Sequence, residues 1–192
     1  MRPRILTVFR EGGDYRWEHV ERLQQQCATH APEAEFLCLR DELLFEGWPG
    51  WWAKMSLFRY AGPILYFDLD TSIVGDLAPL LTAAQRNRFV ALRNPLRTPS
   101  RLGSGIMAWS GDMSHVYHRF RRDPDAHMRR CVTPRLWGDQ GFISESEMPD
   151  AHWQDLLPGQ VLSWKADCKA GVPKHARVVY FHGTPRPWDI GM

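Results

Sequence analysis

The chain has 192 residues, of which 44% are hydrophobic and 24% charged, and its formal net charge is +2. This composition is that of an ordinary soluble protein with a sizeable core, and the length predicts a single domain over residues 1–192. No stretch approaches the 18 consecutive apolar residues of a membrane-spanning helix, so no membrane span is expected.

The cysteines indicate a reducing compartment. The spacings of Cys27, Cys38, Cys131 and Cys168 fit no zinc or redox pattern, so we expect small buried thiols. The first ten residues contain only a short apolar run, which is not typical of a signal peptide. A cytoplasmic location is therefore expected.

Strands and helices are predicted to alternate along the chain. Short apolar runs bounded by turn residues indicate strands, and apolar residues at helical spacing indicate helices. Strands are expected at 5–9, 35–39, 64–67, 89–92, 103–110, 161–162 and 178–181, and helices at 17–28, 51–60, 74–84, 113–122, 124–131 and from 137 onward. This alternation predicts an α/β fold with a largely parallel sheet.

Two carboxylates follow the most apolar of these strands. Asp68 and Asp70 come directly after the run Ile64-Leu65-Tyr66-Phe67, at the strand end where ligands gather in α/β sheets. Carboxylates that close repel each other unless a cation or a proton lies between them. Oxygen ligands favour Mg²⁺ or Mn²⁺ over zinc, so a divalent metal site is the preferred interpretation.

The pair also fits other interpretations. A haloacid-dehalogenase-like phosphohydrolase places Asp-x-Asp after an apolar strand, and Asp68 would then attack phosphorus. Two solvated carboxylates at a strand end are the simplest alternative. The surrounding sequence has to decide between these interpretations.

Five further motifs accompany the pair in a fixed order. They are Lys54, Gly75-Asp76-Leu77, Gly103-Ser104-Gly105-Ile106-Met107, Gly138-Asp139-Gln140, and the closing stretch 180–188, Tyr-Phe-His-Gly-Thr-Pro-Arg-Pro-Trp. Together the motifs resemble those of GT-A-fold glycosyltransferases, especially the glycogenin and lipopolysaccharide galactosyltransferase-like family. The resemblance implies a Rossmann-like three-layer α/β sandwich with a mostly parallel central sheet.

The resemblance also implies a function and a set of site residues. A divalent metal, Mn²⁺ or Mg²⁺, would be bound by Asp68, Asp70 and His182 and would bridge the diphosphate of a nucleotide-sugar. The donor is expected to be a UDP-linked hexose. The residues expected to bind it are Thr7, Lys54, Asp68, Ser104, Gly105, Gly183 and Arg186, and the expected catalytic residues are Lys54, Asp139 and Gln140.

Single residues of this set have simpler structural explanations. Lys54 on a helix face is by default solvated, Asp139 fits a helix start, and Ser104 and Gly105 fit a turn. His182 taken alone is more often a structural histidine than a ligand. The ordered combination favours the functional interpretation over these explanations.

The sequence leaves the acceptor open. A glycan, a protein or a small molecule are the expected choices, and nucleic acid is kept open only by local clusters of arginine. The chain departs from the family pattern at Arg186, where the family usually has lysine, and it has no obvious base-contacting signature on the first strand. A non-catalytic nucleotide-sugar-binding module is the remaining alternative to an enzyme.

Overall fold

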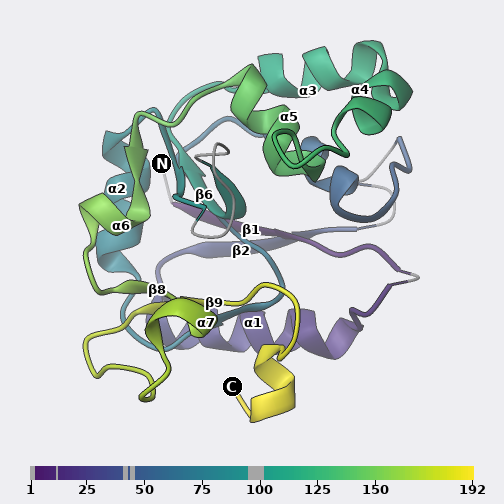
Figure 1. Cartoon of the computed structure of the whole chain (residues 1–192). Helices are drawn as coiled ribbons and strands as arrows, with labels where there is room; N and C mark the ends of the chain where they lie inside the picture. The colour runs from purple at the N-terminus through teal and green to yellow at the C-terminus, as the bar shows by residue number, and fades with distance from the viewer. Residues whose placement is uncertain (1–2, 12, 41–42, 44–45, 95–101) are drawn as a thin grey trace.

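The computed structural model describes residues 3–11, 13–40, 43, 46–94 and 102–192 (Figure 1). A six-stranded sheet in the order β2-β1-β3-β6-β5-β7 forms its centre. Its strands are β1 (Arg4–Val8), β2 (Glu35–Leu39), β3 (Ile64–Phe67), β5 (Phe89–Leu92), β6 (Gly103–Trp109) and β7 (Ala151–His152). Only β6 runs against its neighbours β3 and β5, which confirms the expectation of a mostly parallel sheet.

Both faces of the sheet are buried, because alternate residues of each strand enter opposite cores. In β3, Ile64 and Tyr66 belong to one apolar cluster and Leu65 and Phe67 to the other, and none is more than 1% exposed. The first cluster is covered by the 3₁₀ helix η2 (Gly50–Arg59) and by α3 (Ser114–Arg122) and α5 (Gly138–Ser146). The second cluster is covered by α1 (Trp17–His30) and α2 (Ala78–Arg86).

A second, three-stranded sheet lies against the side that carries α1 (Figure 1). It consists of β4 (Thr71–Ile73), β9 (Val178–Tyr180) and β8 (Val161–Ser163), with β9 in the middle. One face of the central sheet is thus covered by helices together with a small sheet. The expected three-layer sandwich is therefore not confirmed.

This second sheet joins the Asp pair to the end of the chain. β4 pairs antiparallel with β9, and the backbone N–H of Phe181 donates to the carbonyl of Asp70 over 3.1 Å. His182, which follows Phe181, is thereby held beside a segment that precedes it by more than 100 residues. The sequence did not indicate β4, because its three residues are too few to form a recognisable strand pattern.

Several predicted bounds differ from the structure. The predicted helix 51–60 is the 3₁₀ helix η2, in which every residue from Trp52 to Phe58 is buried. The predicted helix 74–84 begins later, as α2 at Ala78, whose backbone N–H donates to Oδ1 of Asp76 over 2.9 Å. The remaining elements are α4 (Pro124–Arg130), α6 (Trp153–Leu156), α7 (Trp164–Asp167) and the 3₁₀ helix η3 (Pro187–Ile190).

Other expectations from composition can also be compared with the structure. All four cysteines are free; three are buried and Cys38 is partly exposed. No helix in the described ranges is long and apolar enough to cross a membrane. Many arginines are paired with acids: Arg119 and Arg130 with Glu145, and Arg93 with Asp155. In these pairs the arginine charge is partly neutralised by a neighbouring acid.

Candidate functional site

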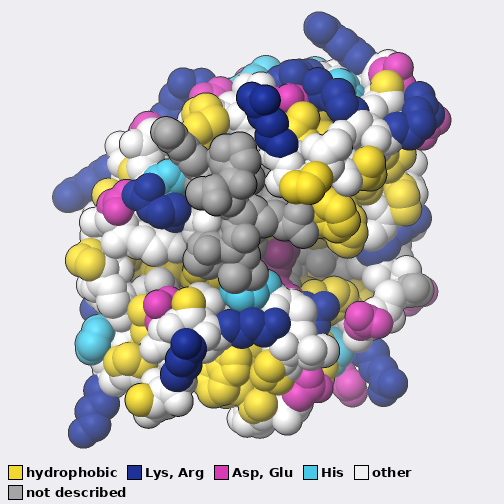
Figure 2. All heavy atoms as spheres, viewed as in Figure 1, with side chains coloured by type: hydrophobic (Ala, Val, Ile, Leu, Met, Phe, Trp, Pro, Cys, Tyr) yellow, Lys and Arg dark blue, Asp and Glu magenta, His cyan; other side chains and the backbone are white. Residues whose placement is uncertain are grey.

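A cavity of about 780 Å³ opens beside the C-terminal end of β3. Figure 2 shows it as a hollow in the middle of one face, with an acidic side chain at its floor and histidine and basic side chains along one edge. Most of the residues expected at the site line this cavity: Lys54, Asp68, Ser104, Gly105, Asp139, Gln140, His182, Gly183 and Arg186. The structure thus brings together residues that are spread over more than 130 positions of the chain.

Lys54 is at the centre of a polar cluster on the cavity floor. Its ammonium lies 2.9 Å from Asp139 Oδ2 and 2.9 and 3.2 Å from the two oxygens of Asp68. It also donates to the hydroxyl of Ser104 over 3.1 Å, and that hydroxyl donates to Asp139 over 2.6 Å. Lys54, Ser104 and Asp139 are 5–7% exposed, and the side chain of Asp68 is partly exposed. The cluster is thus a charge-paired unit with a buried base rather than a set of solvated side chains.

The electrostatics of this cluster keep Lys54 charged. Burial alone works against the ammonium, but the carboxylates of Asp139 and Asp68 outweigh burial and raise the pKa of Lys54. Tyr66, on β3, donates its hydroxyl proton to Asp68. Burial, together with the negative charge of Asp68, raises the pKa of Tyr66, so its phenol remains a neutral donor.

The backbone of β6 positions Asp68. The backbone N–H of Asp68 donates to the carbonyl of Gly105 over 2.8 Å, and a Cβ at Gly105 would lie 3.4 Å from Asp68 Oδ2. A Cβ at position 105 would thus be in ordinary van der Waals contact with the carboxylate. Ser104, on the same strand, reaches Lys54 and Asp139.

Asp70 is held by a different cation. The guanidinium of Arg186 donates to its carboxylate, and the hydroxyl of Tyr15 hydrogen-bonds both Asp70 and Arg186, the latter over 3.0 Å. The side chain of Asp70 is only 9% exposed. Burial and the nearby Asp68 raise the pKa of Asp70 to about 6, although Arg186 opposes this shift.

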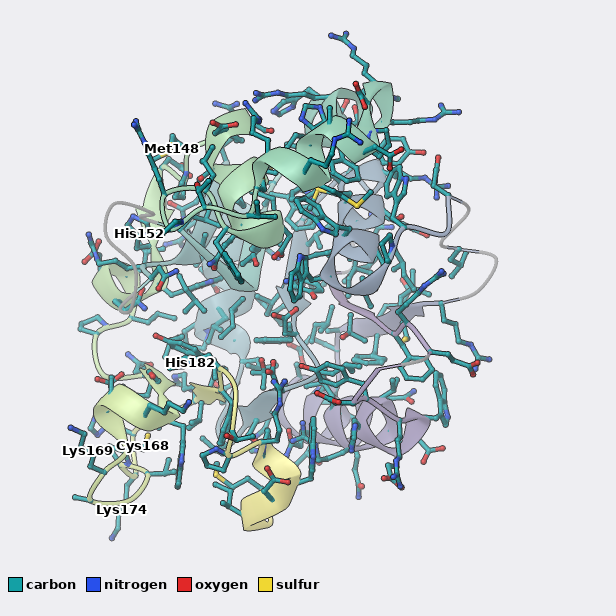
Figure 3. All side chains as sticks on the ribbon, turned by 45° about the vertical axis from the view of Figure 1, so that its right-hand side comes forward. Met148, His152, Cys168, Lys169, Lys174 and His182 are labelled. Atoms are coloured by element: carbon teal, nitrogen blue, oxygen red, sulfur yellow. The ribbon has the colours of Figure 1, made fainter. Side chains whose placement is uncertain are left out.

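His182 lies just after β9, on the inner side of the lobe that carries Cys168, Lys169 and Lys174 (Figure 3). Its Nε2 is 3.0 Å from the hydroxyl of Ser163, which is fully buried. Its Nδ1 is buried and has no hydrogen-bond partner among the described residues. Burial and the nearby Lys165 lower the pKa of His182, which favours the neutral imidazole that a metal ligand requires.

The three expected metal ligands are not gathered into one coordination site. Within the described ranges, no group of three or more His, Cys, Asp and Glu side chains could hold a metal ion. Carboxylate and imidazole donors still suit Mn²⁺, but both oxygens of Asp68 contact Lys54, and Nδ1 of His182 is buried without a partner among the described residues. Asp70 is not among the residues that line the cavity, and its carboxylate is paired with the guanidinium of Arg186.

Thr7 lies apart from the other expected residues. It is fully buried in β1, and its hydroxyl donates to the carbonyl of Phe67 over 2.9 Å. The cavity is lined instead by the neighbouring Val8 and Arg10. Thr7 therefore supports the strand that carries the Asp pair and does not face the cavity.

Several lining residues were not singled out from the sequence. Tyr15 comes from the connection between β1 and α1, and Lys165 comes from the short helix α7, which follows β8; no local pattern marks either residue. Trp51 and Trp137 also line the cavity; the chain has nine tryptophans, and no local pattern singles out these two.

No protein-family model matches the chain, and no curated protein matches it in sequence. Solved structures do match. The apo form of the glycosyltransferase GlyE from Streptococcus pneumoniae TIGR4 superposes with a TM-score of 0.66 at 12% identity, over 98% of this chain and 56% of that protein. The chain has a glycosyltransferase-like fold.

Two other glycosyltransferases share this fold. The galactosyltransferase LgtC, solved with donor and acceptor sugar analogs, gives a TM-score of 0.58 at 12% identity over 96% of this chain and 89% of that protein. WbbM, a bifunctional glycosyltransferase, gives a TM-score of 0.54 at 11% identity, over 97% of this chain and 46% of that protein. The chain spans about half the length of GlyE. These matches confirm that part of the expected resemblance which concerns the fold: the chain folds like a glycosyltransferase.

Proposed function

We propose that this chain is a metal-dependent glycosyltransferase that transfers a hexose from a UDP-linked donor to an acceptor. The observation that carries the proposal is the charge-paired cluster on the floor of the cavity, in which Lys54 and Asp139 are buried and Asp68 is partly exposed, within a glycosyltransferase-like fold. A buried ion cluster that faces a cavity is typical of a functional site.

The charges around the cavity suit a nucleoside diphosphate. Arg186 and Lys165 line it and could pair with phosphate oxygens, and the backbone of Gly183 borders it without a side chain. Cations fixed at that position would stabilise the negative charge that develops on the leaving diphosphate. Asp139 and Gln140, at the N-terminus of α5, would then contact the transferred sugar.

A divalent metal belongs to this proposal through three residues. Asp68, Asp70 and His182 would hold Mn²⁺ or Mg²⁺, which acts as a Lewis acid on the diphosphate when bound. For Asp70 to take part, Arg186 has to release its carboxylate. The guanidinium would then be free to bind the donor phosphates.

Release of nucleoside diphosphate from nucleotide-sugars tests this function. The protein is incubated with UDP-hexoses and Mn²⁺, and free UDP is measured with and without a mixture of saccharide acceptors. We expect release by the native chain and none by Asp139→Asn, with Glu145→Gln on the outer part of α5 as the matched control. A native chain that binds UDP-hexose but releases no UDP would instead be a binding module.

The same sample tests the phosphohydrolase alternative. In that class Asp68 would be a free nucleophile, whereas here both its oxygens contact Lys54 and one also accepts from Tyr66. Cleavage of a chromogenic phosphate ester, lost in Asp68→Asn, would favour the phosphohydrolase. We expect the ester to stay intact.

A further inference from the structure

Two tryptophans lie at the mouth of the cavity. Trp51 and Trp137 both line it, and they are 55% and 39% exposed. Figure 2 shows hydrophobic surface along one edge of the hollow. Leaving this much indole surface in water is costly unless a ligand covers it. We call this pair the aromatic rim.

Each tryptophan of the aromatic rim is tied to a polar residue of the cavity floor. In a 3₁₀ helix, residues three apart lie on one face, so Trp51 and Lys54 of η2 share a face. On α5, Trp137 is the N-cap and Asp139 follows two residues later. The 2.9 Å ion pair between Lys54 and Asp139 joins the two elements and so fixes the two tryptophans relative to the floor.

Gly138 brings the two sides of the aromatic rim together. Its φ is +59°, which favours glycine, and a Cβ there would lie 3.1 Å from Nε1 of Trp51. The indole of Trp51 therefore packs against the backbone of the residue that follows Trp137. The arrangement is specific, because any other residue at 138 would be strained and would push Trp51 away.

We propose that the aromatic rim stacks on a pyranose ring, and that the acceptor of the proposed transfer is accordingly a saccharide. This inference rests on the proposed function. One face of a pyranose presents C–H groups, which pack on the flat, electron-rich face of an indole. Asn94 and Gln140 line the same cavity and supply amide groups for the hydroxyls of the sugar. The donor phosphates would lie on the opposite side, at Arg186 and Lys165.

The tryptophan indole N–H signals in NMR test this inference. The chain has nine tryptophans, and Trp51→Phe and Trp137→Phe assign the two signals of the aromatic rim. Lactose, maltose and cellobiose are titrated to millimolar concentration. We expect at least one to shift both signals and to leave that of Trp17 unchanged, since Trp17 is exposed on α1, outside the cavity lining.

Binding constants of two matched variants complete the test. Trp51→Ala is expected to weaken affinity for the binding saccharide about tenfold, whereas Trp17→Ala leaves it unchanged. UDP affinity, measured on the same samples, stays the same in both variants. Equal saccharide affinity in Trp51→Ala and the native chain would overturn the inference.

The outcomes separate this inference from the proposed function. If UDP binds and no saccharide shifts the aromatic rim, the saccharide acceptor is wrong and the donor proposal stands. Shifts by an alkyl alcohol alone would also overturn the inference and indicate an apolar acceptor. If saccharides bind without any UDP binding, the aromatic rim is supported and the donor proposal fails.

Discussion

The ammonium of Lys54 lies 2.9 Å from a carboxylate oxygen of Asp139, and both side chains are almost completely buried. The pair joins η2 to α5 below the cavity. Removing one member of a buried ion pair leaves the other charge uncompensated, which is more costly than the loss of the contact itself.

Lys54→Met should therefore destabilise the protein strongly. We expect the free energy of unfolding to fall by about 3–5 kcal/mol, measured by urea denaturation, because both Asp68 and Asp139 lose their cation. Lys165→Met is the matched control, since Lys165 lines the same cavity but is exposed. An equal effect of the two substitutions would mean that Lys54 has no special structural role.

The pair of Asp70 and Arg186 should show strong energetic coupling. Arg186→Met removes the guanidinium that pairs with the buried carboxylate of Asp70, whereas the double variant with Asp70→Asn removes the negative charge as well. We expect a coupling energy of about 1–3 kcal/mol in a double-mutant cycle of unfolding free energies. Additive effects of the two substitutions would show that the ion pair contributes nothing to stability.

Ser163 should act on the site through His182. Its hydroxyl is 3.0 Å from His182 Nε2 and also caps α7 at Ala166. Ser163→Ala is expected to cost about 1 kcal/mol of stability as a lost cap and to weaken Mn²⁺-dependent UDP binding at least about tenfold, as for other residues that orient a ligand.

Ser163→Thr keeps the hydroxyl and is the matched variant. Calorimetry should find UDP affinity restored in Ser163→Thr. A Ser163→Ala protein that binds UDP and Mn²⁺ as tightly as the native chain would show that His182 needs no such support.

The stability of the fold should depend on pH through His19. This residue stacks on Trp188 with ring centroids 3.6 Å apart, and burial lowers its pKa below the usual 6.5. The folded protein then binds the proton less tightly than the unfolded chain does. The stabilisation is fully present above pH 6.5 and is lost as the pH falls through the folded-state pKa of His19.

Urea denaturation at a series of pH values between about 5 and 7.5 measures this dependence. His19→Gln should give a flatter curve than the native chain, and His118→Gln, on the exposed side of α3, is the control for the loss of an imidazole. Identical curves for His19→Gln and the native chain would contradict the assignment.

Local patterns in the sequence predicted β3 and the Asp pair, because a fully buried strand needs an unbroken apolar run. Lys54, Asp139 and His182 could be grouped only through their order in a family-like set of motifs. The 3₁₀ form of η2 could not be predicted, since its dense apolar run fits an α-helix equally well.

Other features depend on long-range contacts. Arg186 meets Asp70 only because β4 pairs with β9, and the sequence carries no local sign of β4. The hydroxyl of Thr7 donates to the carbonyl of Phe67 because β1 lies beside β3 in the sheet. A polar residue in a strand can satisfy a buried carbonyl or face a ligand, and the residue type alone does not distinguish the two.

The central claim is that a nucleoside diphosphate binds in this cavity with the help of a metal ion. Calorimetric titration of UDP into the protein, with and without Mn²⁺, tests it most directly, using the native chain and Asp68→Asn. The account predicts binding by the native chain that requires Mn²⁺ and is lost in Asp68→Asn. Absence of UDP binding by the folded native chain in the presence of Mn²⁺, or undiminished binding by Asp68→Asn, would contradict it.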